Sequence, residues 1–537
     1  MRENRDHPIK QHILPLLLIA VVAMVISVRH LNEPPAYIHA WTQADNYSLA
    51  LGFQHNGCDL FHPQTLIFNK QQFGFKDPET LVTGCDFPLH HWIAAVLMNI
   101  TGSSQPWVFR GWTLAVTILG LWALYLLVFV LSGSRAKSLL VAAFTATAPS
   151  FAYYSASFLP TIPALSLAVG GLLFYALYWR SDKIWQLYIS LLLLSLSMMT
   201  RSSFAVLWVA VAGFHILRLW RHEVRFRSTW LPFVLGAALF TSWWLWNLHL
   251  RHEYGSLFLG SLLPVHNLED AKFVMQNVHD RWRFHYFLRM SHWLYVAVAA
   301  GALVTLIVRR KSPPTESKRL SPWWLLAIWV FGEILFIIAM SQQFSDHDYY
   351  FLDSLYLPVM LSFAGLLCIL PNPSKRWGRM IVLTGVLIIT GFMTVKACQM
   401  QKTRRLEGTE ALTTAIRYKN ANQLLEQIGC GSKDLRFLTL FSYPQNLPFV
   451  MMDREGYAVM WNRPSVVNHA LKFKYDYILV EDEIYRNLFE EAHYILPRLQ
   501  RLAGNGEISV CRLSDSVIHP TAEHFFEGPG ELGENIR

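Results

Sequence analysis

The sequence has few charged residues and few cysteines for its length. Only 15% of the 537 residues are Asp, Glu, Lys or Arg, whereas soluble domains carry about 25%. This shortage argues against a soluble multidomain enzyme, and the 53% hydrophobic content argues against a disordered chain. Six cysteines are too few for a disulfide-stabilised scaffold, and the chain has neither a Cys-x-x-Cys pair nor a His-Glu-x-x-His sequence.

Long apolar runs take up most of the first 400 residues. A helix needs about 20 apolar residues to cross a membrane, and 20 Trp, 21 Tyr and 34 Phe suit a chain that meets two membrane–water interfaces many times. We predict eleven spans, at 12–28, 107–131, 138–155, 158–179, 184–200, 203–220, 229–249, 291–308, 322–341, 350–370 and 380–396. The first run follows a basic start but no small-residue cleavage site, so we expect a retained span, not a signal peptide.

Lys and Arg are distributed unevenly between alternate loops. The loops at 150–157 and 342–349 have neither residue, and 29–86 has only Arg29, Lys70 and Lys76, whereas the alternate loops are basic. The positive-inside rule therefore predicts a cytoplasmic N-terminus. It also requires that 87–100, only 14 residues long, lie in the outer interface as a helix that does not cross. The net charge of +9 is accounted for by these loops and does not indicate nucleic acid.

Hydropathy falls after residue 396. We predict a transmembrane domain over 1–396, whose first outer loop is 29–106, and an outer α/β domain over 397–537. Within this outer domain the pattern predicts strands at 435–441, 475–480 and 507–513 and helices at 410–428 and 482–500. Two roles stay open for it: a roof over the site that helps to select the acceptor, or a stability module without chemistry.

The first outer loop contains two acidic passages. One runs from His39 to Tyr47 and includes Gln43 and Asp45; the other, Gly84 to Trp92, includes Asp86. A carboxylate at the membrane surface can accept a proton from a hydroxyl nucleophile or bind a sugar hydroxyl. The alternative is that both aspartates are helix caps in a solvated loop.

These passages carry a family resemblance. HAWTQADNYSLALGF resembles the first-loop stretch of bacterial family 39-type glycosyltransferases, and CDFPLHHWIAA resembles a second stretch with a counterpart in the lipid A aminoarabinose transferases. SDHDYYFLDSLYLPVML is similar to a third stretch, and Thr200-Arg201 stands where relatives often have Thr-Lys. The resemblance covers most of the chain in the same order.

The resemblance implies a GT-C fold and a multi-pass protein of the bacterial inner membrane. Such enzymes move a sugar from a polyprenyl-phosphate carrier to a lipid, glycan or protein acceptor on the periplasmic side. Asp45 matches the essential first-loop aspartate and is the expected base of an inverting transfer. Asp86 stands where many relatives have Glu and is the second expected catalytic residue, which orients the acceptor or the sugar or shares the proton. Thr42 replaces the usual Arg, so a phosphate or sugar contact of the family has another origin or is absent.

Other polar residues are candidates for substrate binding. Arg110 and Arg201 can hold the carrier phosphate, with interface snorkelling as the alternative. His347, Tyr349 and Tyr350 are expected to line the carrier pocket, with an aromatic belt as the alternative. His39 and Gln43 complete the expected binding residues, whereas His90 and His91 are interpreted as residues that decorate the interfacial helix. No metal site is predicted, although a divalent cation at 346–348 stays open.

Cysteine placement suggests two pairs. Cys58 and Cys85 share the first outer loop, and Cys430 and Cys511 share the outer domain. An oxidising compartment would favour disulfides between them, but the connectivity does not follow from the sequence.

Two other function classes compete with a glycosyltransferase. A lipid-linked sugar flippase would show inverted repeats and ionisable residues within spans, but the polar residues gather in one outer loop. A non-catalytic membrane scaffold that presents 397–537 leaves the two acidic passages unexplained.

Overall fold

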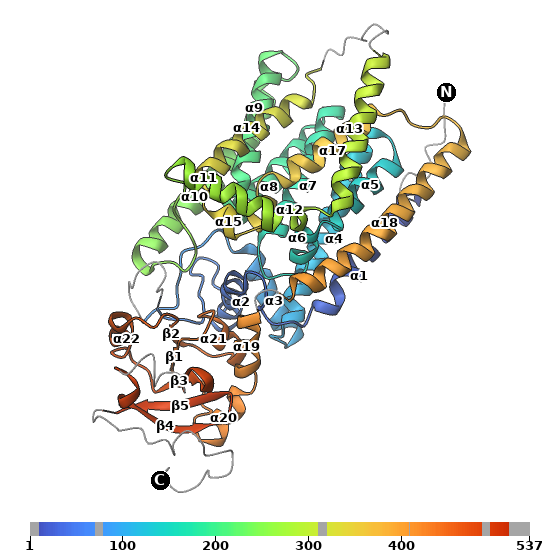
Figure 1. Cartoon of the computed structure of the whole chain (residues 1–537). Helices are drawn as coiled ribbons and strands as arrows, with labels where there is room; N and C mark the ends of the chain where they lie inside the picture. The colour runs from blue at the N-terminus through green and yellow to red at the C-terminus, as the bar shows by residue number, and fades with distance from the viewer. Residues whose placement is uncertain (1–9, 70–78, 310–318, 407–408, 486–493, 515–537) are drawn as a thin grey trace. The chain divides into compact units, whose positions relative to one another are not determined.

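The computed structural model describes residues 10–69, 79–309, 319–406, 409–485 and 494–514. The chain forms two compact units, and Figure 1 gives the order of the elements along it. The first unit contains residues 1–31, 110–245 and 260–403, and the second contains 32–109, 246–259 and 404–537. The predicted domain boundary at residue 397 stays a proposal.

Helices make up the first unit. They are α1 (Lys10–Ser27), α4 (Pro106–Ser132), α5 (Arg135–Ala146), α6 (Pro149–Tyr154), α7 (Thr161–Ser181), α8 (Ile184–Thr200), α9 (Ala205–Trp220), α10 (Phe226–Tyr254), α11 (Leu268–Asn277), α12 (Arg283–Tyr286), α13 (Arg289–Arg309), α14 (Trp323–Ala339), α15 (Gln343–Asp346), α16 (Tyr349–Leu352), α17 (Tyr356–Ile369) and α18 (Arg376–Arg404). The first residues of α4 and the last of α10 belong to the second unit.

Seven stretches of the described chain are long and apolar enough to cross a membrane. They are Lys10–His30, Pro106–Ser132, Thr161–Ser181, Ser202–Trp220, Thr229–Tyr254, Arg289–Val308 and Arg376–Arg404. Three shorter apolar helices are Ile184–Thr200, Trp323–Ala339 and Tyr356–Ile369. The chain is therefore a multi-pass membrane protein, and the count of eleven spans stays a prediction.

The expected span at 138–155 is wrong as a single helix. The chain leaves the helical conformation at Ala148, which is extended, and α6 begins at Pro149. Proline disfavours helical geometry in the residue before it, so the break follows from the sequence. With 12 residues, α5 is about 18 Å long, shorter than the membrane core. The expected span at 350–370 is likewise divided, since α16 ends at Leu352 and α17 begins at Tyr356.

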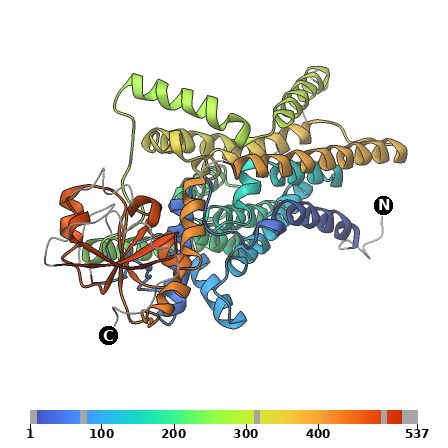
Figure 2. The same cartoon turned by 60° about the horizontal axis from the view of Figure 1, so that its bottom comes forward.

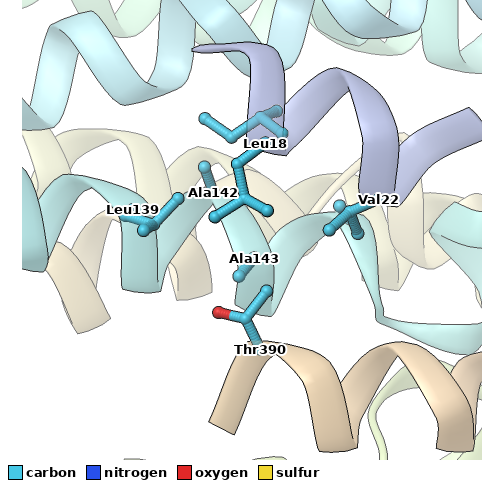
Figure 3. Close-up of a pocket in the computed structure, with 8 residues that line it drawn as sticks. Leu18, Val22, Leu139, Ala142, Ala143 and Thr390 are labelled. Carbon is cyan, nitrogen blue, oxygen red and sulfur yellow. The ribbon is translucent and has the colours of Figure 1, made fainter. Parts of the chain in front are cut away.

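Small and hydroxyl residues allow helices of the first unit to pack closely. Ser190 and Ser197 of α8 donate hydrogen bonds to the carbonyls of Gly171 (2.8 Å) and Ala164 (2.7 Å) of α7. Figure 3 shows side chains of α1, α5 and α18 pointing toward one another, among them Leu18, Val22, Leu139, Ala142, Ala143 and Thr390. Their packing leaves no volume for a water molecule. Such contacts hold helices together where lipid removes the hydrophobic driving force.

The second unit combines helices with a five-stranded sheet among its described residues. Its helices are α2 (Ala40–His55), α3 (Leu89–Thr101), α19 (Thr409–Tyr418), α20 (Ala421–Gln427), α21 (Leu447–Met452) and α22 (Pro464–Ala470). Its strands are β1 (Phe437–Leu440), β2 (Gly456–Val459), β3 (Tyr477–Glu481), β4 (Leu499–Gly504) and β5 (Ile508–Leu513), in the order β2-β1-β3-β5-β4. The strand β1 is parallel to β2 and β3, and β5 is antiparallel to β3 and β4. Figure 2 shows the sheet after a rotation.

The predicted strands at 435–441, 475–480 and 507–513 are confirmed as β1, β3 and β5. The predicted helix at 410–428 is present as α19 and α20. The predicted helix at 482–500 is present at its start, since 482–485 are helical, but it is wrong at its end, where Leu496–Arg498 form a short turn and β4 begins at Leu499. Residues 486–493 lie outside the described residues. In β4, backbone pairing to β5 overrides the weak helical pattern.

Candidate functional site

The helix α2 is buried along nearly its whole length, which determines the surroundings of Asp45. On one side, Ala40 and Ala44 pack with residues of α19 and α21. On another, Leu49 and Phe53 pack with Cys85 and with Ala95 of α3. The carboxylate of Asp45 therefore lies within the second unit, and this residue is only 4% exposed.

Asp45 has a hydrogen-bond partner from the C-terminal part of the chain. The side-chain amide of Asn446, the residue before α21, donates to Asp45 Oδ1 at 2.6 Å. Burial raises the pKa of Asp45 to about 7, and the Asn446 hydrogen bond opposes this rise because it stabilises the carboxylate. A carboxyl group with a pKa near 7 can exchange a proton with a reacting group at neutral pH.

The start of α2 is held in a constrained conformation. His39 caps the helix with φ of 55°, the left-handed region that side chains other than glycine rarely adopt. Gln43 is buried and its amide donates to the carbonyl of Ile38 at 2.9 Å. Gln43 therefore holds the entry loop of the helix, and such constrained backbone often accompanies functional sites.

The interpretation of His90 and His91 as decoration of a surface helix is wrong. Both lie in α3 and are 3% and 4% exposed, because α3 packs against α2. His91 Nε2 lies 2.7 Å from Asn46 Oδ1. Burial lowers the pKa of His91 to about 3, so the ring is neutral and its Nε2–H donates to Asn46. Nδ1 of His91 has no hydrogen-bond partner among the described residues, which leaves a buried acceptor beside the Asp45 helix.

Asp86 lies in a segment that is pinned to the end of α10. The backbone of Gly84 donates to Gly255 at 3.0 Å, and Ser256 Oγ donates to the Gly84 carbonyl at 2.6 Å. A Cβ at Gly84 would come within 2.4 Å of Cγ of Arg251, so glycine is needed at this close approach. Asp86 is half-buried, and its charge acts on the Arg251 guanidinium. Asp45 and Asp86 therefore have different partners.

A second group of predicted residues comes together in the first unit. Arg201, at the end of α8, forms a salt bridge with the buried carboxylate of Asp353, with Nη2–Oδ2 at 2.6 Å and Nε–Oδ2 at 2.7 Å. Its guanidinium carbon lies 5.5 Å from the ring centroids of both Tyr349 and Tyr350. His347 stacks edge-on against Tyr349, with ring centroids 5.4 Å apart. Four residues chosen from the sequence thus form one cluster, which we call the Arg201 cluster: Arg201, His347, Tyr349 and Tyr350, with Asp353 added.

Arg110 and Asp348 have partners within the protein. Arg110 is buried, donates to the carbonyl of Ala156 at 2.7 Å and lies 4.3 Å from the Phe158 ring centroid. Asp348 accepts hydrogen bonds from Ser150 and Tyr154, both at 2.7 Å. Among the described residues, no group of three or more His, Cys, Asp or Glu side chains is arranged to hold a metal ion.

The cysteine pairs suggested by the sequence are not formed, since all six thiols are free. Cys511 on β5 lies opposite Ile478 on β3, in the hydrophobic core. Cys430 interacts with Tyr477. Tyr477 and Ile478 are neighbours in β3, so the side chain of Tyr477 points to the opposite face of the sheet from that of Ile478. Cys430 and Cys511 are therefore separated by the sheet. Cys58 and Cys85 share one hydrophobic cluster as free thiols.

Three residues of these groups were missed by sequence reasoning. Asn446 and Asp353 each contact a predicted residue, and Arg251 interacts electrostatically with Asp86. For Asp353 there was a signal, because a carboxylate beside an apolar run needs a cationic partner. Asn446 gave no signal, since its role depends on a contact across 401 residues.

Known proteins support the same architecture. Residues 85–246 match the family model described as dolichyl-phosphate-mannose-protein mannosyltransferase. The crystal structure of ArnT from Cupriavidus metallidurans in the apo state is similar with a TM-score of 0.58 and 10% identity, over 95% of this chain and 99% of that one. The cryo-EM structure of the arabinofuranosyltransferase AftD from Mycobacteria is similar with a TM-score of 0.51 and 13% identity, over 94% of this chain and 42% of that one. No curated protein sequence matches the chain.

The ArnT likeness spans both chains almost completely, so it concerns the whole architecture. At 10% identity it shows the fold, and the family model adds an independent sequence match that includes Asp86, α3, Arg110 and Arg201. The chain therefore shares the GT-C fold of these membrane glycosyltransferases, and residues 85–246 match a family model of such enzymes.

Proposed function

We propose that this protein transfers a sugar from a polyprenyl-phosphate carrier to an acceptor hydroxyl, with inversion at the sugar carbon and with Asp45 as the base. The acceptor is a lipid, glycan or protein hydroxyl on the periplasmic side of a bacterial inner membrane. The proposal is supported above all by one observation: Asp45 is buried, it accepts a hydrogen bond from Asn446, and its pKa is raised to about 7.

The reaction needs little general-acid catalysis from the protein. The acceptor oxygen forms a bond to the anomeric carbon, the bond from that carbon to the phosphate oxygen breaks, and the hydroxyl proton passes to Asp45. Polyprenyl phosphate leaves with the electron pair and is already a stable anion. Asp86, whose charge acts on Arg251, orients the acceptor or the sugar.

The Arg201 cluster is the proposed contact for the carrier phosphate. Asp353 fixes the guanidinium through Nε and Nη2, which leaves other N–H groups for an anion. Arginine suits this task because its planar fork matches phosphate oxygens. The donor class is supported by the family model, whose description names a dolichyl-phosphate sugar, which is itself a polyprenyl-phosphate sugar.

The test uses purified full-length protein with radiolabelled polyprenyl-phosphate sugars and a periplasmic glycolipid fraction as acceptor. The wild type should release polyprenyl phosphate and label the acceptor. Asp45→Asn keeps the shape but removes the base, so turnover should fall at least ~100-fold. Asp59→Asn is the matched control, because Asp59 is an exposed residue of the same loop bonded to His62 three residues away.

Near-normal turnover in Asp45→Asn would refute the base assignment. Movement of the lipid-linked sugar across the membrane without cleavage would instead favour a flippase. Neither cleavage nor movement would favour a scaffold.

A further inference from the structure

A large apolar cavity lies in the first unit, apart from the Arg201 cluster. Its volume is about 450 Å³, within the ~300–1,000 Å³ of small-molecule sites. It is lined by side chains of α4, α7, α9, α14 and α17 and of the segment before α14, among them Leu172, Phe214, Trp323, Trp329 and Leu361. Neither the proposed transfer nor the Arg201 cluster uses it.

The cavity is at one end of the helices that line it. It includes Leu172 to Arg180 of α7, Ser321 to Trp329 around the start of α14, and Leu361 to Ile369 of α17. Each stretch is nine residues, so the cavity runs about 12 Å along the helices. The lining residues Arg180, Ile369 and Ser321 stand at the ends of α7 and α17 and just before α14, and we call this end of the cavity its mouth. These ends lead into the Lys- and Arg-rich loops that the positive-inside rule assigns to the cytoplasm.

The mouth of the cavity has positive charge without a local counter-ion. Arg180 is exposed there and forms no salt bridge within the described parts of the chain. The charges of Arg180 and Lys137 both act on Cys368, which lines the cavity. Nearby acids are already paired, Asp182 with Arg319 at 2.9 Å and Glu223 with Arg218 at 3.4 Å.

The mouth also holds an unsatisfied hydrogen-bond donor. Nε1 of Trp179, one residue before Arg180, is buried and has no partner among the residues described. A buried indole N–H without an acceptor is unfavourable by about 1–3 kcal/mol. Trp329, deeper in the cavity wall, donates to Glu333 at 2.7 Å, so its N–H is satisfied.

We propose that this cavity binds an anionic phospholipid of the cytoplasmic leaflet. An acyl chain fills the apolar part, and headgroup or ester oxygens accept the hydrogen bond from Trp179 and meet the charge of Arg180. Basic pockets between membrane helices on the cytoplasmic side suit such lipids, because that leaflet carries anionic headgroups. The site is independent of the proposed sugar transfer.

Lipid retention measured by native mass spectrometry tests the proposal. Full-length protein is delipidated in detergent and titrated with dioleoylphosphatidylglycerol or dioleoylphosphatidylcholine. The wild type should retain phosphatidylglycerol in preference. Arg180→Gln should lower retention roughly fivefold, the usual effect of one cation near a lipid surface. Trp179→Phe keeps the ring but loses the donor and should lower retention roughly threefold.

Two further variants separate the cavity from the general charge of this surface. Lys183→Gln removes the same charge three residues away, from an exposed residue outside the cavity lining, and should retain lipid as the wild type does. Ala176→Phe places a ring in the cavity and should abolish preferential retention, with monodispersity in detergent as the folding check.

Equal retention of the two lipids by the wild type, or unchanged retention in both Arg180→Gln and Trp179→Phe, would overturn the proposal. A polyprenyl phosphate that displaces phosphatidylglycerol at equal or lower concentration would overturn the phospholipid assignment. Arg180→Gln and Trp179→Phe are substitutions at the cavity mouth, so they remain informative if Ala176→Phe does not fold.

Discussion

Nδ2 of Asn446 donates a hydrogen bond of 2.6 Å to Oδ1 of Asp45, although 401 residues separate them in the sequence. Asn446 is buried, as is Asp45, and both belong to the same compact unit. The C-terminal part of the chain therefore contributes a direct partner to the proposed base. A tail that served only as a separate stability module would not need this contact.

Replacing Asn446 by Ala should shift the pH dependence of transfer to higher pH. The base acts as a carboxylate, so the rate should rise with pH through the pKa of Asp45, about 7 in the wild type. The Asn446 hydrogen bond lowers that pKa, so its loss should raise the midpoint of the rise by about one unit. The measurement is the pH profile of turnover at saturating carrier lipid.

Asn56→Ala is the control for this profile. Asn56 is an exposed residue at the end of the same helix, and its amide donates only to the Gly52 carbonyl. Its profile should follow that of the wild type. If Asn446→Ala loses turnover without any shift of the midpoint, Asn446 does not tune Asp45.

Gly84→Ala should impair sugar transfer because it displaces Arg251. The added Cβ would lie 2.4 Å from Cγ of Arg251 and 2.9 Å from Oδ1 of Asn247, so the arginine must leave the position in which its charge interacts with Asp86. We expect turnover to fall roughly tenfold or more, since small misplacements at a site are costly to the rate. Gly111→Ala is the matched control, because a Cβ there meets no atom within 4 Å. Wild-type turnover in Gly84→Ala would show that Asp86 does not require Arg251 in place.

Arg201→Gln should raise the KM for the carrier lipid, with a smaller effect on kcat. The substitution removes the charge of the proposed phosphate contact and leaves the carboxylate of Asp353 unpaired. Arg201→Lys keeps the charge but loses the planar fork, so its KM should lie between those of Arg201→Gln and the wild type. Steady-state kinetics with a soluble short-chain carrier separate the two constants. A reduced kcat at an unchanged KM would assign Arg201 to the fold instead of to the carrier.

Local patterns in the sequence predicted much of the membrane part of the fold. Apolar runs such as 203–220 became helices because lipid requires backbone groups to be satisfied within the segment. The helix break before Pro149 also follows from the sequence, but the prediction of one span over 138–155 missed it because Pro149 lies within an apolar run. The strand β2 was not predicted because it contains Gly456 and Ala458, which have low strand propensity, and β4 was not predicted because a bulged edge strand has a weak pattern.

The sequence predicted those residues of the candidate site that stand in recognisable motifs, and it did not predict their partners elsewhere in the chain. The resemblance could select Asp45, Arg201, His347, Tyr349 and Tyr350, because they stand in passages that it covers. Asn446 has no such context, and its importance follows only from the packing of α21 against α2. The burial of His90 and His91 likewise depends on the residues that pack over α3. The amphipathic pattern of α3 alone does not predict this packing.

His55→Gln should destabilise the second unit at neutral pH but not at high pH. His55, at the end of α2, lies 2.9 Å from Asp453 and 3.9 Å from Glu455. These carboxylates raise the pKa of His55 from its usual 6.5 to about 9. A raised histidine pKa contributes stability that is fully present below about pH 6.5 and is lost as pH rises through about 9.

Thermal unfolding of wild type and His55→Gln from pH 6 to 10 measures this effect. The difference in Tm should be largest at low pH and should vanish above about pH 9. His62→Gln is the control, since the carboxylate that pairs with His62 belongs to Asp59, only three residues away. A constant Tm difference over the whole range would mean that His55 acts through packing and not through its charge.

The segment that contains α3 should not cross the membrane. With 13 residues, α3 is about 20 Å long, too short for a membrane core of about 30 Å. Ser103, just after it, should therefore be on the outer side, together with the first outer loop. In intact cells, a membrane-impermeant maleimide should label Ser103→Cys and not Ser181→Cys, which lies exposed at the end of α7, on the side assigned to the cytoplasm. Both should react after permeabilisation, with peptide mass spectrometry distinguishing the new thiols from the native ones. Labelling of Ser103→Cys only after permeabilisation would mean that 87–100 crosses, and the orientation of every later loop would then be inverted.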